Sequence, residues 1–187
     1  MAFAADSHTT NDVVRQAIIP LTKASGQCYA SLVGAQAPAK FVTHNWANLF
    51  RHLLAAVLSD ALGEAEFFPV ACLLDGNIDH LEQLLHEKGA LRRAYWICAF
   101  SVAQHVSICD APHGVDSVSK MPYPPCDCGR LKALNDTPPT LDGRSIPCEM
   151  NKFQDMIRYL ATDHFEGQVV AIDCDFGLFQ RRSAKET

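Results

Sequence analysis

The feature that most constrains this 187-residue chain is a long stretch, residues 105–147, that regular secondary structure cannot easily occupy. Its seven prolines and three glycines oppose helices and central strands, because proline fixes φ and lacks a backbone donor. Unstructured loops of this length are uncommon in compact domains and are usually functional or held in place. Five side chains of metal-ligand type lie in or beside the stretch: Cys109, His113, Cys126, Cys128 and Cys148.

A bound metal ion is one way to hold such a stretch together. Structural zinc sites take four ligands, mostly thiolates and imidazoles. We therefore predict a zinc ion on four cysteines, with His105 or His113 able to replace one thiol; the four are Cys109, Cys126, Cys128 and Cys148. Only one residue separates Cys126 from Cys128, which is closer than in most zinc motifs, so plain loop thiols remain the alternative. With four protein ligands the ion would supply folding energy and no catalysis.

The rest of the chain alternates between strand-like and helix-like hydrophobic patterns. We expect strands at 41–43, 67–74, 95–100 and 168–173, an edge strand at 176–180, and helices at 12–20, 46–62, 78–88 and 149–161. This order predicts an α/β fold with a mostly parallel sheet and flanking helices. The predicted division is an N-terminal helix and linker (1–40), an α/β domain (41–182) carrying the Cys- and Pro-rich insertion at about 105–147, and a tail (183–187).

Composition excludes several classes of partner. A net charge of −5, with no basic run interleaved with aromatic residues, argues against a nucleic-acid-binding protein. No apolar run approaches the roughly 20 residues that a membrane span needs, and no signal peptide is visible at the start, so we expect a soluble cytoplasmic protein. Its eight cysteines are interpreted as reduced thiols, because the chain has enough apolar residues for a core without disulfides.

A second candidate site lies where the predicted strands end, since open α/β sheets bind ligands at that edge. His44 and Trp46 follow the first strand, and Gln104 and His105 follow the third. An imidazole titrates near neutrality and can act as a base, and an indole can stack on a planar ring. The structural alternative is that His44 caps the next helix and Trp46 packs beneath it. Glu149 opens the last predicted helix, where a carboxylate is also favoured by the helix dipole alone.

Three segments resemble motifs of TIR-like and heterokaryon-incompatibility (HET) domains. Residues 41–46, Phe-Val-Thr-His-Asn-Trp, resemble the strand with Ser-His-x-Trp that opens TIR-like domains. Residues 95–104 are similar to the HET motif Trp-Ile-Asp-Ala-x-Cys-Ile-Asn-Gln, with Cys98 where the motif has aspartate. Residues 149–153 are similar to the Glu-x-x-x-Phe that precedes the last helix and strand.

The resemblance implies a flavodoxin-like sheet that serves signalling and self-association and, in some members, hydrolyses NAD with a catalytic glutamate. Glu149 and His44 would then be catalytic, and Trp46, Gln104 and His105 would bind NAD. Because Cys98 replaces the motif aspartate, we favour an intracellular signalling or scaffold domain that binds itself or other signalling domains. An NAD-cleaving hydrolase that uses Glu149 is the alternative.

Overall fold

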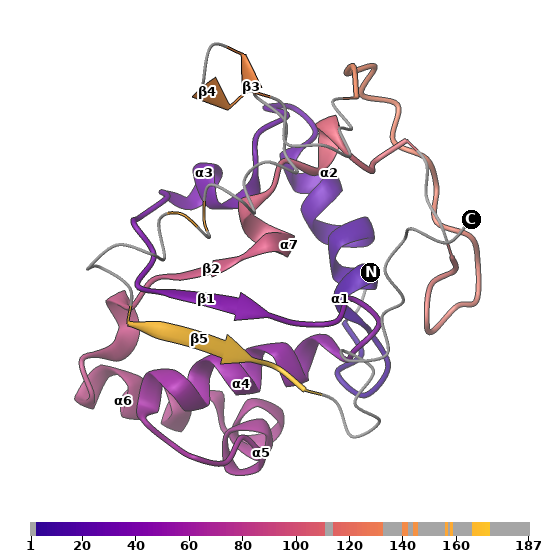
Figure 1. The fold of residues 1–187 in the computed structure, drawn as a ribbon. Helices are drawn as coiled ribbons and strands as arrows, with labels where there is room; N and C mark the ends of the chain where they lie inside the picture. The colour runs from indigo at the N-terminus through magenta and orange to yellow at the C-terminus, as the bar shows by residue number, and fades with distance from the viewer. Residues whose placement is uncertain are drawn as a thin grey trace.

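Three parallel strands form the centre of the computed structural model, which describes residues 3–110, 114–132, 140–141, 144–145, 156, 158 and 166–172. The strands are β1 (Lys40–Thr43), β2 (Tyr95–Ile97) and β5 (Gly167–Val170), in the order β2-β1-β5 (Figure 1). Phe41 of β1 lies opposite Trp96 on one side and Gln168 on the other. A separate antiparallel pair joins β3 (Thr140–Leu141) to β4 (Arg144–Ser145). The predicted mixed fold with a parallel sheet is confirmed.

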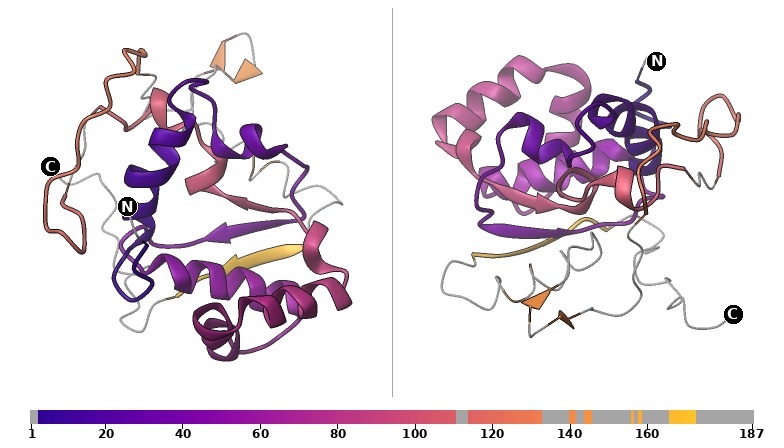
Figure 2. Two further views of the ribbon diagram at one scale, coloured as in Figure 1. Left: turned by 180° about the vertical axis from the view of Figure 1, so that it is seen from behind. Right: turned by 90° about the horizontal axis from the view of Figure 1, so that it is seen from above.

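Helices precede the first strand, fill the connection between β1 and β2, and follow β2. They are α1 (Thr10–Val13), a π-helical turn (Val14–Ile18), α2 (Ile19–Thr22), α3 (Tyr29–Val33), α4 (Phe50–Leu62), α5 (Phe68–Gly76), α6 (Ile78–Glu87) and α7 (Cys98–Ser101), with 3₁₀ turns at Ala90–Arg92 and Gln104–Val106. The helices α4, α5 and α6 connect β1 to β2 and lie together on one side of the sheet (Figure 2). None of the helices in the described ranges is long and apolar enough to cross a membrane.

Alternating residues of β1 face different layers, as the pleat of a strand requires. Lys40 forms an ion pair with Asp60 of α4 at 2.8 Å, so this side of β1 faces that helix. Phe41, which points the other way, stacks on Trp96 with ring centroids 4.9 Å apart. The main core lies on the α4 side and includes Val14, Val42, Leu53, Val57, Ile97 and Val169. The N-terminal helix thus contributes to the same core as the sheet.

The strongest periodic helix of the sequence is confirmed, although it begins later than predicted. Leu53, Val57 and Leu62 of α4 are buried, and the helix ends at Gly63, whose φ of 78° is the left-handed conformation that favours glycine. The helix predicted at 78–88 is also present as α6, where the Asn77 side chain accepts a hydrogen bond from the backbone N–H of His80.

One element prediction was wrong, and two elements are present with different ends. Residues 67–74 were expected to form a strand but lie mainly in α5, which packs against α4 and α6; Pro69 stands in its first turn, where a missing N–H costs little. The strand predicted at 95–100 ends at Ile97, and α7 begins at Cys98. The N-terminal helix continues past Pro20 to Thr22, because a π-helical turn, in which the Ile19 N–H bonds the Val14 carbonyl, precedes the proline.

Two predicted elements near the end of the chain fall largely outside the described residues. Of the helix predicted at 149–161, only Met156 and Arg158 are described, and both are helical. The edge strand predicted at 176–180 lies entirely outside the described ranges.

Candidate metal site

One histidine and three cysteines meet beside the N-terminal helix. The ligand atoms of His105, Cys109, Cys126 and Cys128 all lie within 4.8 Å of one another. His105 belongs to the 3₁₀ turn Gln104–Val106, and Cys109 follows it by four residues. The other two cysteines lie on a later part of the chain. A hydrogen bond of 2.9 Å from the Cys126 N–H to the Cys109 carbonyl holds this part beside Cys109.

The spacing of the ligand atoms suits a single tetrahedral ion. The Sγ atoms of Cys109 and Cys128 are 3.6 Å apart, and the Sγ of Cys126 is 3.7 Å from Nδ1 of His105. A zinc tetrahedron with bonds of about 2.3 Å to sulfur and about 2.0 Å to nitrogen has edges of about 3.8 Å between sulfurs and about 3.5 Å between sulfur and nitrogen. These two of the six separations agree with the edges to within about 0.2 Å, and all six are within 4.8 Å.

The ring of His105 is already oriented for a metal. Its Nε2 lies 3.0 Å from the carbonyl oxygen of Ile19 and 3.0 Å from the hydroxyl of Thr22. A carbonyl can only accept, so Nε2 carries the proton and the Nδ1 lone pair is left toward Cys126. Burial lowers the pKa of His105, which favours the neutral ring that binds metals. Hydrogen bonding of the second ring nitrogen to a carbonyl is the usual support for a metal-bound histidine.

Charges around the cysteines would stabilise thiolates at the centre. Burial raises the pKa of Cys109 to about 11, and the ammonium group of Lys132, 3.0 Å from its Sγ, opposes this effect. A hydrogen bond from the backbone of Arg130 lowers the pKa of Cys128. Three thiolates around one divalent ion leave one excess negative charge. Lys132, which also donates to the His105 carbonyl at 2.6 Å, is placed to balance that charge.

The part of the chain that carries the cluster is bound to the N-terminal helix, which is far from it in sequence. We call residues 104–132 the connecting segment, of which 104–110 and 114–132 are described. Besides the contacts of His105, Arg15 donates to the Ile108 carbonyl at 2.6 Å, and Arg130 donates to the Ala24 carbonyl at 3.3 Å. Lys23 forms an ion pair with Asp127, which stands between two of the cysteines. The connecting segment is therefore attached to the end of α2.

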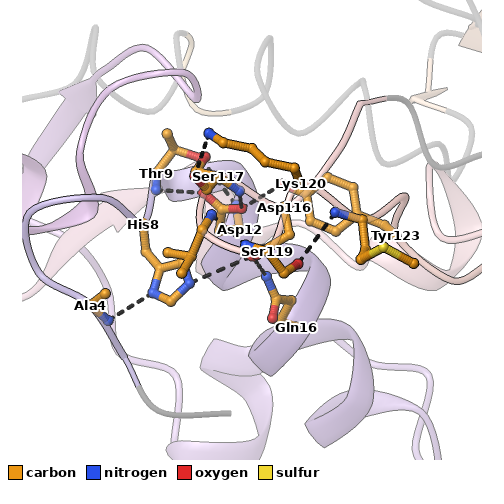
Figure 3. Close-up of polar contacts among 12 residues, drawn as sticks. Ala4, His8, Thr9, Asp12, Gln16, Asp116, Ser117, Ser119, Lys120 and Tyr123 are labelled. Carbon is orange, nitrogen blue, oxygen red and sulfur yellow. Dashed lines mark hydrogen bonds and ion pairs between the residues drawn. The ribbon is translucent and has the colours of Figure 1, made fainter.

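A second polar network attaches the connecting segment to the start of the same helix (Figure 3). The buried carboxylate of Asp12 accepts from the Tyr123 hydroxyl at 2.6 Å, from the Ser117 N–H at 2.9 Å and from the Thr9 hydroxyl at 2.6 Å. Burial acts to raise the pKa of Asp12, but the hydrogen bonds from Ser117, Thr9 and Tyr123 together outweigh burial and lower it. Asp12 is ionised at neutral pH.

His8 and Asp116 extend this network (Figure 3). The Ala4 N–H donates to Nδ1 of the buried His8 at 2.8 Å, and Nε2 of that ring lies 3.5 Å from an oxygen of Asp116. The Gln16 amide also donates to Asp116. None of these residues is predicted by the sequence patterns to contact the others. The only local signal was the capping box formed by Thr9 and Asp12, which predicts a helix start but no long-range contact.

The structure brings three of the four predicted metal cysteines together. The fourth, Cys148, and the alternative ligand His113 lie outside the described residues. His105, which the resemblance implied for NAD binding and which was also an alternative metal ligand, lies with the cysteines.

The other predicted site residues lie at the ends of β1 and β2. Trp46 donates from Nε1 to the Cys98 sulfur at 3.3 Å, and His44 Nε2 lies 3.7 Å from the same sulfur. Gln104 is buried and donates to the Ala99 carbonyl at 3.4 Å. Glu149, the predicted catalytic residue, lies outside the described residues.

Comparison with protein families, with curated proteins and with solved structures finds no match to this chain.

Proposed function

We propose that this chain is a protein-interaction domain of the signalling or scaffold type whose connecting segment is held by a structural zinc ion. The observation that carries the metal assignment is the convergence of four ligand atoms, from His105, Cys109, Cys126 and Cys128, within 4.8 Å. One imidazole and three thiolates are a common ligand set of structural zinc. With every tetrahedral position filled by protein, the ion has no open position for a substrate.

The ion would add to the polar contacts that hold a segment without regular secondary structure. Between residues 107 and 132, the described residues contain no helix or strand, and one isolated bridge joins Val115 to Pro122. A segment without a helix or a sheet opens more easily than regular secondary structure does. A cross-link between the turn that carries His105 and the later cysteines compensates for that weakness.

The interaction role is supported by apolar side chains that the connecting segment exposes. Val115, Val118, Met121 and Leu131 are between 47% and 90% exposed. Exposed apolar side chains mark a surface that meets a partner where they lie together in one patch, which is what we propose for these four. If the loop is held in one conformation before binding, less conformational entropy is lost when a partner binds.

Topology supports a relation to flavodoxin-like domains, of which TIR-like domains are one kind. The parallel order β2-β1-β5 has the first strand of the chain in the middle, as in the 2-1-3 part of the flavodoxin-like order. The resemblance to TIR-like and HET domains remains a prediction from the three sequence motifs. The NAD-cleaving alternative, which needs Glu149, also remains a prediction.

Metal analysis tests the centre directly. We expect protein purified without chelator to contain about one equivalent of zinc, as a closed site with four protein ligands should. Cobalt(II) exchanged into the emptied site should give the intense visible absorption of a tetrahedral thiolate complex, and added zinc should abolish it. Protein that contains no zinc and gives no such absorption on cobalt addition would contradict the proposal.

Self-association tests the interaction role. We expect size-exclusion chromatography with light scattering to show a mass that rises with protein concentration, because copies meet through the exposed loop. A double change of Met121 and Leu131 to glutamate should return the protein to the monomer. The matched control Ile78→Glu, at a residue that is 59% exposed on α6, should not. A protein that is monomeric at every concentration would exclude self-association as the function of this surface.

A further inference from the structure

A second feature, independent of the zinc site, is a cavity of about 510 Å³ beside the start of β2. It lies between α3, the chain that leads from α3 to β1, and the 3₁₀ turn Ala90–Arg92. Figure 1 shows α3 next to β2, on the far side of β2 from β5. The volume falls within the range of about 300–1,000 Å³ that is usual for small-molecule sites.

The lining of the cavity combines an apolar body with a positive rim. Ala30, Val33, Pro38, Leu91 and Trp96 supply apolar surface, and Val33 and Leu91 remain 65% and 53% exposed. Two consecutive arginines, Arg92 and Arg93, also line it. Among the lining residues that the structure describes, none is acidic, although the chain as a whole carries a net charge of −5. The cavity is thus a local concentration of positive charge in an acidic protein.

We infer that this cavity binds a small organic anion, a carboxylate attached to an apolar body. The apolar part would lie against Trp96 and Val33, where its surface leaves water. The carboxylate would lie at the rim, where a guanidinium can donate two parallel hydrogen bonds to it. Arg93 makes a long hydrogen bond, 3.4 Å, to the backbone carbonyl of Asp60. Arg93 is thereby held toward Asp60, which does not line the cavity, so Arg92 supplies the guanidinium that meets the carboxylate at the rim.

The volume and the apolar lining of the cavity admit either an aromatic or an alkyl body, so the test uses one probe of each kind. Binding of 2-naphthoate and of decanoate to the full chain is measured by isothermal titration calorimetry and by ligand-observed NMR. The neutral isostere 2-naphthamide is the control for the charge. We expect one saturable site for at least one carboxylate, and naphthoate or decanoate to bind at least about tenfold more tightly than the amide, because the arginines recognise the anion.

Variants locate that site. Val33→Asp introduces a negative charge at an exposed wall residue, so we expect the carboxylate affinity to fall about tenfold, while Val33→Asn should change it less than about threefold. Replacing both Arg92 and Arg93 by glutamine should weaken the carboxylate about tenfold and leave the amide unchanged. Lys88→Gln removes a positive charge outside the cavity and should have no effect.

Each outcome decides the inference. Preferential binding of either carboxylate with loss in Val33→Asp supports it, and the better probe identifies the body as aromatic or alkyl. No saturable binding of either carboxylate, equal affinity for the amide, or binding unaffected by Val33→Asp and by the double arginine change would each overturn it. These results do not depend on zinc, because the cavity shares no lining residue with the four metal ligands.

Discussion

Replacing Cys126 by serine will lower the melting temperature of the zinc-loaded protein by about 8–16 °C. An ion that binds only the folded chain stabilises it by about 4 kcal/mol when free zinc is about 1,000 times its Kd. A chain of this size loses about 2–4 °C for each kcal/mol. Cys126 is partly exposed, so exchange of sulfur for oxygen has little effect on packing, and the loss reports the ion. Differential scanning calorimetry at a buffered zinc concentration measures it.

Two controls distinguish the effect of losing the zinc ion from the effect of losing the thiol itself. Cys72→Ser changes an exposed cysteine of α5 and should leave the melting temperature within about 1 °C. A strong chelator should lower the melting temperature of the wild-type protein to that of Cys126→Ser and leave the melting temperature of the variant unchanged. If the difference between wild type and variant persists after chelation, the cysteine stabilises the fold by a route other than zinc.

Replacing Asp12 by alanine will destabilise the protein by about 3–5 kcal/mol, because the Tyr123 hydroxyl and the Ser117 N–H lose their charged acceptor in a buried place. Asp12→Asn keeps the shape of the side chain and one acceptor oxygen, so this variant should lose less stability than Asp12→Ala. Asp6→Ala, in which the side chain is 81% exposed and paired with Arg51, should cost less than about 1 kcal/mol. Urea unfolding followed by circular dichroism compares the three variants.

The pH dependence of the Asp12 effect has a defined sign. Because the folded pKa is lowered, the stability contributed by the carboxylate is fully present above its unfolded pKa of about 3.9 and is lost as the pH falls toward the folded value. The gap in unfolding free energy between wild type and Asp12→Ala should therefore be constant from pH 7 to about 5 and narrow below about pH 4. A gap that widens in acid would mean that Asp12 is not the ionised acceptor.

The parts of the fold that follow from local patterns were predictable. The apolar face of α4 repeats with helical spacing and ends at a glycine, so periodicity alone predicts both its packing and its end. The strand at 67–74 was a wrong prediction, because a short apolar run fits a buried strand and a helix equally well. Only its packing between α4 and α6 decides the matter, and that contact is not visible in the sequence.

Part of the candidate metal site was likewise predictable from the sequence, and part was not. The clustering of cysteines in a proline-rich stretch was enough to indicate Cys109, Cys126 and Cys128 as metal ligands. The choice between His105 and His113 depends on which ring the fold orients, and Ile19 and Thr22, more than 80 residues earlier, orient His105. The contacts of Asp12 could not be predicted, because a single acidic residue in a first helical turn is ordinary.

The attachment of the N-terminal helix to the connecting segment has a consequence for biosynthesis. The bond between Asp12 and Tyr123 closes 111 residues of chain, and that between Thr22 and His105 closes 83. The helix is made before the connecting segment, so Asp12 and Thr22 lack their partners in that segment until it has left the ribosome. Contacts of such high sequence separation form slowly. The polar groups of the helix are therefore among the last in the chain to find their partners during synthesis.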